Sequence, residues 1–168
     1  MARKSAESVD RALLLALVDE AFDRRAWHGP NLRGSIRRVT PEQAVWRPRS
    51  GRRNIVEIVM HCAYWKYAVR RRIRGDKRGS FPLKGSNWFE SPARLSPDEW
   101  RGLAKLLEQQ HHELRDAIER APWSTLRSAR KGTAPTAAHV HGVAMHDLYH
   151  AGQIQTIKAL YKNDHGAR

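Results

Sequence analysis

Two histidines lie on the apolar face of a predicted helix near the end of this chain. The face is formed by side chains at steps of three or four residues: Val143, His146, His150, Ile154, Ile157 and Tyr161. This spacing predicts a helix over about residues 136–161 that presents one side to a core. Residues four apart on a helix lie about 5–6 Å apart on the same side. Burying two imidazoles there is costly unless a metal ion or a hydrogen-bonded partner takes up their nitrogens.

The same period, together with several capping signals, predicts the other helices. We expect one long helix over residues 9–39, kinked at Gly29-Pro30, and a short helix over 40–46. Two more long helices are expected over 54–74 and 96–121. No regular alternation typical of β-strands is present. Helices with one apolar face each pack together, so we expect an all-α protein, a four-helix bundle with a long crossover loop after the second long helix.

That loop, residues 75–95, has little periodicity and contains Phe81-Pro82 and Asn87-Trp88-Phe89. Loops of this length inside compact domains often act as lids or binding segments. Aromatic side chains in a loop can equally serve to anchor a packed crossover. The sequence leaves both alternatives open.

The size and composition of the chain are those of one helical domain. With 168 residues, the chain is expected to form a single domain over 1–168, with an ordered core over about 9–162 and a frayed tail before it. A single cysteine, Cys62, excludes an internal disulfide and favours a cytoplasmic location. The first residues lack the apolar segment of a signal peptide, and no apolar run is long enough to span a membrane.

The charge of the chain is strongly positive, since 31 Lys and Arg residues stand against 17 Asp and Glu residues, a formal net charge of +14. Such a balance favours anionic partners, from small acidic molecules to nucleic acid. A solvated basic surface without a partner is the simpler explanation. No helix-turn-helix or zinc-finger spacing is present, so a nucleic-acid partner is not favoured.

A third histidine, His61, borders the apolar face of the predicted helix over residues 54–74. In a bundle, inward-facing side chains on neighbouring helices build metal sites, so His61 can complete a ligand set with His146 and His150. Three protein ligands leave a coordination position open, as in catalytic metal sites. His139 is excluded from this set because it lies about 10 Å along the helix axis from His146.

Three segments of the chain resemble the DinB-like superfamily, which includes the YfiT-type metal-dependent hydrolases. They are Trp27-His28-Gly29-Pro30, the segment from Ile55 to Trp65 that contains His61, and the segment from His146 to Ile154. Their order and separation agree across about residues 9–162. The resemblance implies a four-helix bundle with a long crossover, and one divalent metal ion, Zn²⁺ or Ni²⁺, bound by His61, His146 and His150.

The resemblance also implies a reaction neighbourhood and a set of partners. Assigned members of the superfamily include amide-type hydrolases and transferases or isomerases that use a low-molecular-weight thiol, and homodimers are common among them. We therefore expect a small-molecule substrate and a homodimer. Fold alone does not fix function, so two alternatives stay open: a nucleic-acid-associated protein of the damage response, and a dimeric bundle without catalytic activity.

Further candidate residues follow from their spacing to the histidines. Glu57, four residues before His61, either orients the His61 imidazole or only caps its helix. Gln153, three residues after His150, is expected to reach the open coordination position or the substrate. These two are the candidate catalytic residues, and no serine–histidine–acid set is recognisable. Four aromatic residues are candidate walls of a pocket: Trp27, His28, Trp65 and Trp88.

Overall fold

The computed structural model describes residues 2–129 and 131–166, of which residues 2–5 are described by their backbone alone. In these residues the chain forms seven helices and no strand, which confirms the all-α prediction. The four long helices are α1 (Ala2–Phe22), α4 (Ile55–Arg74), α5 (Pro97–Arg120) and α7 (Thr136–His165). The three short helices are α2 (Leu32–Ile36), α3 (Pro41–Val45) and α6 (Trp123–Arg127). None of the described helices is both long and apolar enough to cross a membrane.

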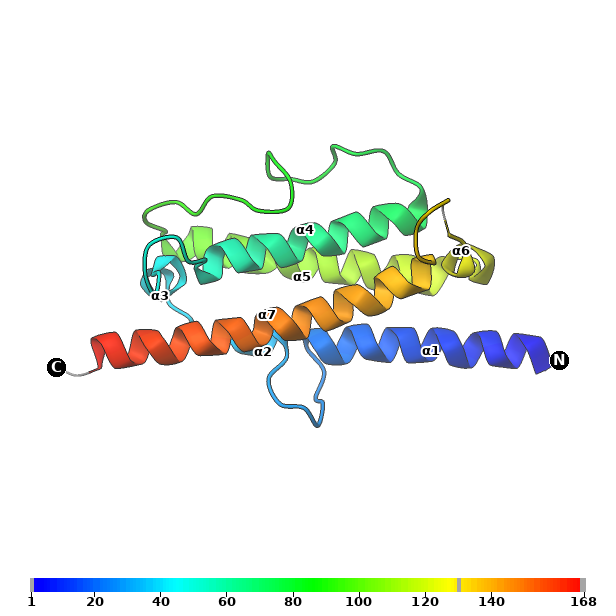
Figure 1. The fold of residues 1–168 in the computed structure, drawn as a ribbon, viewed down its shortest axis with the longest axis horizontal. Coiled ribbons are helices and arrows are strands. Elements are labelled where there is room, and N and C mark those ends of the chain that lie inside the picture. Colours follow the sequence, from blue (N-terminus) through cyan, green and yellow to red (C-terminus); the bar gives the residue numbers. More distant parts are fainter. Residues whose placement is uncertain (1, 130, 167–168) are drawn as a thin grey trace.

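The four long helices pack side by side, and each contacts two others. Helix α4 contacts α5 and α7, and α1 contacts the same two helices from the other side. Figure 1 shows that α4 and α5 run in the same direction, as α1 and α7 do. Because parallel neighbours cannot be joined by a tight turn, the segment between α4 and α5 returns along the length of the molecule (Figure 1). The predicted crossover after the second long helix is therefore present.

The predicted helix over residues 9–39 was wrong in detail, because this region forms two helices. Helix α1 already begins at Ala2 and ends at Phe22, and a loop that projects from the molecule leads to α2 (Figure 1). Asn31 starts α2 through its side-chain oxygen, which accepts a hydrogen bond from the Gly34 amide at 2.8 Å. The side-chain NH₂ group of Asn31 also donates a hydrogen bond of 2.8 Å to the Arg24 carbonyl. This capping by Asn31, together with Gly29 at φ 101°, replaces the kink with a turn.

Capping side chains begin three of the other helices where the sequence predicted them. Thr40 caps α3, and Asn54 caps α4 by accepting from the Glu57 amide at 3.0 Å. Ser96 and Glu99 form a reciprocal capping box at the start of α5. Helix α4 ends at Arg74 and is capped by Gly75, whose φ of 75° is accessible to glycine at no steric cost.

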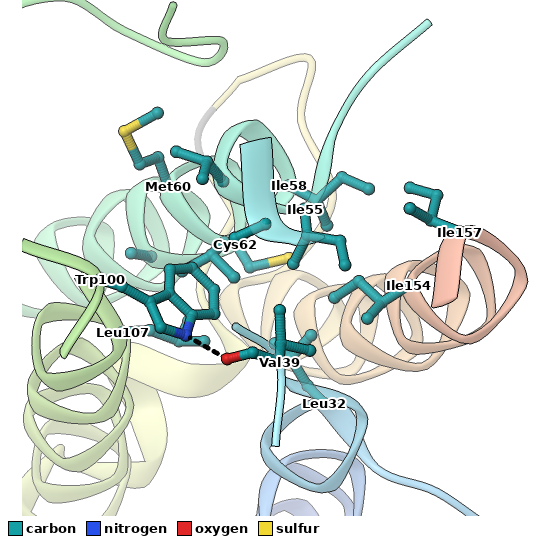
Figure 2. Close-up of a cluster of buried hydrophobic side chains, with 14 of the residues drawn as sticks. Leu32, Val39, Ile55, Ile58, Met60, Cys62, Trp100, Leu107, Ile154 and Ile157 are labelled. Carbon is teal, nitrogen blue, oxygen red and sulfur yellow. Dashed lines mark hydrogen bonds between the residues drawn. The ribbon is translucent and has the colours of Figure 1, made fainter. Parts of the chain in front are cut away.

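An apolar core holds the short helices against the long ones (Figure 2). Leu32 and Val39 from the α2–α3 region meet Ile55, Ile58 and Leu107 of the long helices, together with Ile154. The Trp100 indole donates a hydrogen bond of 2.9 Å to the Val39 carbonyl, as drawn in Figure 2. A buried indole N–H needs such a partner, so Trp100 fixes the chain between α2 and α3 against α5.

The crossover segment is packed against α4 by its aromatic side chains. Phe89 is buried, and its ring centroid lies 5.8 Å from that of Tyr64 on α4. Phe81 packs edge-on against the same tyrosine at 5.4 Å. These contacts agree with the packed-crossover alternative, and they place residues 87–89 beside the middle of α4.

Candidate metal centre

The structure brings the three predicted ligand histidines to one point between α4 and α7. The Nε2 atom of His146 lies 2.9 Å from Nε2 of His61 and 3.1 Å from Nε2 of His150. Ligand atoms of all three residues lie within 4.8 Å of one another. His61 and His150 are buried and His146 is half-buried. The closest contact, between His61 and His146, therefore joins α4 to α7 across 85 positions of the sequence.

These separations match those of nitrogens that share one metal ion. Two nitrogens at about 2.0–2.1 Å from one ion, at angles of about 90–110°, lie roughly 2.8–3.4 Å apart. The two observed Nε2 separations, 2.9 and 3.1 Å, fall within that interval. Side chains of α4 and α7 are thus already spaced for a common ion.

The outer nitrogens of two of the rings show which ring nitrogen carries the proton. Nδ1 of His61 lies 2.8 Å from the Asn87 carbonyl oxygen, and Nδ1 of His150 lies 2.7 Å from Oε1 of Gln153. Both partners are acceptors, so each Nδ1 carries the hydrogen. In the neutral rings, Nε2 of His61 and Nε2 of His150 then present lone pairs towards Nε2 of His146. His146 has one hydrogen at most to offer from that atom, so at least one lone pair is left without a donor, and a cation at this point satisfies it.

Burial keeps the three imidazoles neutral. It is the main cause that lowers the pKa of His146 to about 3 and that of His150 to about 4. The pKa of His61 is lowered as well, first by burial and then by the Arg53 guanidinium. A neutral imidazole has the free lone pair that a metal ion requires, so the three rings are in the binding form at neutral pH.

Two of the predicted aromatic walls line this centre. Trp88, from the crossover segment, stacks on the His61 ring with a centroid distance of 3.7 Å and an interplanar angle of 5°. Trp65 packs edge-on against both His61 and His146 at 6.3 Å. Its indole donates a hydrogen bond of 3.0 Å to the Asn87 side chain. The two indoles therefore limit the access of water to the His61 side of the centre.

Glu57 does not orient His61. Arg47 donates hydrogen bonds to both carboxylate oxygens of Glu57, at 2.6 and 3.0 Å, and Arg53 lies 3.6 Å from one of them. Burial is the largest single influence on the pKa of Glu57 and raises it, but Arg47 and Arg53, with the hydrogen bond at Asn54, together lower that pKa below its ordinary value. Its amide is the partner of the Asn54 cap, which fits the helix-start alternative. The His61 ring donates its Nδ1 hydrogen instead to the Asn87 carbonyl.

A sequence model of the DinB superfamily matches residues 23–154 of the chain. This chain belongs to the DinB superfamily. The match covers all three histidines, the crossover segment and most of α7. No curated protein and no solved structure gave a match.

Trp27 and His28, which are part of the resemblance to the superfamily, lie away from the histidines. Both are in the loop between α1 and α2, and Trp27 is 96% exposed. The nearest ring to Trp27 is that of His28, at 6.5 Å. The structure therefore does not bring these two predicted pocket residues to the three histidines, because the break after Phe22 turns their loop outward (Figure 1).

Asn87 is the residue of the centre that sequence reasoning missed. Its carbonyl binds His61 and its side chain binds Trp65, so it connects two residues of α4 to the crossover segment. It does so at a φ of 61°, a left-handed conformation that asparagine tolerates better than most residues. The only sequence signal was an asparagine beside a tryptophan in a long loop. Every residue has a backbone carbonyl, so residue type does not reveal which carbonyl accepts a hydrogen bond from a histidine.

A second set of ligand types shares His146 but is less suited to a metal ion. Cys62, His146 and Asp147 have ligand atoms within 4.8 Å of one another. Burial raises the pKa of the Cys62 thiol well above its ordinary value, so the thiol keeps its proton. Asp147 is already bound by the Lys66 ammonium group. A metal ion needs deprotonated and free ligands, so the three histidines are the better set.

A cavity of about 610 Å³ opens beside the three histidines, and His150 lines it. Its lining also includes Gln153 and Trp88, together with apolar residues of α4 and α7. A volume of this order accommodates a small organic molecule. Gln153, a candidate catalytic residue, lines this cavity and contacts Nδ1 of His150, and its amide nitrogen also donates to the Tyr149 hydroxyl at 2.9 Å.

Proposed function

We propose that this chain is a metal-dependent enzyme in which His61, His146 and His150 hold one divalent metal ion, Zn²⁺ or Ni²⁺. The reaction is a hydrolysis, or a transfer that uses a low-molecular-weight thiol, on a small molecule bound in the adjacent cavity. The observation that carries the proposal is the convergence of three neutral imidazoles, in which Nε2 of His146 lies 2.9 Å from that of His61 and 3.1 Å from that of His150. Without a cation, this arrangement leaves at least one buried lone pair unsatisfied.

The residues around the histidines support the roles that such an enzyme needs. The Asn87 carbonyl and the Gln153 amide oxygen hold the Nδ1 hydrogens of His61 and His150, and so aim both Nε2 atoms inward. When bound, a divalent ion supplies Lewis acidity, which polarises a carbonyl or lowers the pKa of a bound water or thiol. Three protein ligands leave room for such a group. The cavity begins at His150, so a substrate there lies next to the ligand set.

The one cysteine of the chain, Cys62, is unsuited to act as a nucleophile, which is compatible with a nucleophile bound to the metal. The Cys62 thiol is fully buried, and burial raises its pKa, so it is neither reachable nor reactive. A nucleophile bound to the metal, whether water or a thiol cosubstrate, makes a protein nucleophile unnecessary.

The experiment has two stages, the first of which tests the metal and the second the reaction. Protein purified without an affinity tag is stripped of metal, dialysed against Zn²⁺ or Ni²⁺, and measured by elemental analysis. We expect one metal ion per chain, and a clearly lower content after addition of either ion contradicts the proposal. The loaded protein is then screened against amides, esters and thiol-conjugation pairs. A turnover that persists unchanged in His150→Ala means that the metal centre does not catalyse it.

A further inference from the structure

The cavity beside the histidines has a one-sided charge. Arg49, Arg52 and Arg53 line it, and among the described residues that line it there is no aspartate or glutamate. Over residues 47–57 the chain has four arginines and one glutamate. That glutamate, Glu57, is bound by Arg47 and Arg53, so no carboxylate forms an ion pair with Arg49 or Arg52 in the described part of the chain. Two cations at this cavity are therefore left uncompensated.

These arginines lie on a segment that is fixed in place. The Arg47 guanidinium donates a hydrogen bond of 2.6 Å to the Arg52 carbonyl, which closes the turn through Gly51 at φ 76°. The Arg53 guanidinium lies 4.5 Å from the centre of the Trp88 ring, a cation–π contact. Trp88 in turn stacks on His61. The basic segment is thus held against the same indole that covers the metal centre.

The cavity also has apolar lining residues. Ile58 of α4 and Ile157 and Leu160 of α7 line it, beside His150 and the polar side chains of Tyr149, Gln153 and Thr156. Leu160 is 42% exposed, a large value for a leucine on a long helix, and it lines this cavity. A ligand that fills the cavity therefore meets an apolar wall, a cluster of guanidinium groups and the metal centre together.

We propose that the substrate of this centre is a small organic carboxylate with an apolar body, and that Arg49 and Arg52 bind its carboxylate while Ile58, Ile157 and Leu160 contact its apolar part. This rests on the proposed function for the reaction, but the anion site itself needs no metal. A guanidinium presents a planar fork of N–H donors that matches a carboxylate. The apolar walls exclude a ligand that is charged throughout.

Calorimetry with model ligands tests the anion site. The probes are octanoate, the neutral octanamide and the short acetate, each titrated into metal-free and metal-loaded protein. We expect octanoate to bind about tenfold or more tightly than either other probe in both forms, since charged hydrogen bonds and apolar contact are both required. Selectivity that persists without metal separates the arginine site from a carboxylate that simply ligates the ion.

Matched variants identify the residues. The double variant Arg49→Gln/Arg52→Gln should lose about tenfold in octanoate affinity and little in octanamide affinity. The control is Arg25→Gln/Arg127→Gln, which removes the same charge at exposed positions that do not line the cavity, and should change neither. Equal affinity for octanoate and octanamide, or equal losses in the two double variants, overturns the inference. If the protein binds no metal but keeps the selectivity, the proposed function fails and the carboxylate site stands.

Discussion

Lys66 on α4 donates a hydrogen bond to Asp147 on α7 inside the bundle, and the side chains of both residues are at most 1% exposed. This pair links the two helices that carry the three histidines, one residue away from His146. Burial raises the pKa of Asp147 to about 6, while Lys66 acts to lower it. The pair is thus an ion pair whose desolvation is only partly offset by its attraction.

Removing one member of this pair is expected to be more damaging than removing both. Lys66→Met leaves an unpaired buried carboxylate, which should lower the free energy of unfolding by about 3–5 kcal/mol. Lys66→Met/Asp147→Leu replaces both charges with apolar groups and should be clearly more stable than Lys66→Met. Urea denaturation at pH 7 measures both. The exposed Arg101–Asp98 pair is the control, since Arg101→Gln should change little. A double variant no more stable than the single one contradicts this account.

A buried histidine on α5 should make the fold sensitive to acid. His111 is 1% exposed and stacks on Phe22 of α1 at 3.9 Å. Burial is the main cause that lowers its pKa to about 2, and the Lys66 ammonium group acts in the same direction. Asp19 lies 3.7 Å away, but its carboxylate is already bound by Arg115 and Arg24. His111 therefore stays neutral in the folded protein.

The sign of the effect follows from the two states. In the unfolded chain, His111 takes up a proton below about pH 6.5, and in the folded chain it does so only near pH 2. Stability from this group is therefore complete above pH 6.5 and is lost as the pH falls towards 2. Between pH 6.5 and 5.0 the loss is about 2 kcal/mol, at about 1.36 kcal/mol per unit.

His111→Leu should remove this dependence, and denaturation curves at pH 6.5 and 5.0 measure it. We expect the variant to gain about 2 kcal/mol relative to the unmodified chain between these two values. His112→Leu, at the exposed neighbouring position, should follow the unmodified chain. Parallel losses in His111→Leu and the unmodified chain would mean that His111 is accessible to protons in the folded state.

Asn54 both caps α4 and binds the end of α3, and two variants at this position separate the two roles. Asn54 accepts from the Glu57 amide and donates to the Val45 carbonyl at 3.1 Å, so it also ties α3 to α4. Asn54→Ala loses both bonds and should cost about 1–2 kcal/mol of stability. Asn54→Ser keeps a capping oxygen and should recover part of that loss. Thermal unfolding compares the two, and equal melting temperatures would assign the whole effect to the Val45 contact.

Three of the long helices, several caps and the shared face of His146 and His150 could be predicted because each leaves a local mark in the sequence. The spacing of three and four residues placed His146 and His150 on one face, and Asn54 and Ser96 marked helix starts. The meeting of His61 with that face was a spatial inference, and the resemblance to the superfamily supported it. Where α1 ends was misjudged, since Gly29-Pro30 fits both a kink and a loop.

Other parts of the centre left no such mark. The Asn87 carbonyl that binds His61 belongs to the backbone of a loop, and any residue has one. The Lys66–Asp147 pair joins side chains 81 positions apart, and neither residue stands out from the many charged residues of the chain. Trp27 and His28 were expected at a pocket, but their place is set by how the α1–α2 loop leaves the bundle. Such features depend on the packing of distant segments, which local periodicity does not encode.

The ligand set itself predicts an order of metal affinities among three variants on α7. His146→Ala removes a ligand, and Gln153→Leu removes only the acceptor that holds His150. His139→Ala changes a half-buried ring whose Nδ1 contacts the Pro135 carbonyl at 3.0 Å. Loss of an outer hydrogen-bond partner typically lowers metal affinity about 10–100-fold, so we expect Gln153→Leu in that interval. His146→Ala should lose more metal affinity than Gln153→Leu, and His139→Ala should keep the affinity of the unmodified chain. Competition with a chromophoric chelator measures all three, and equal affinities for the two alanine variants would mean that the ion is bound elsewhere.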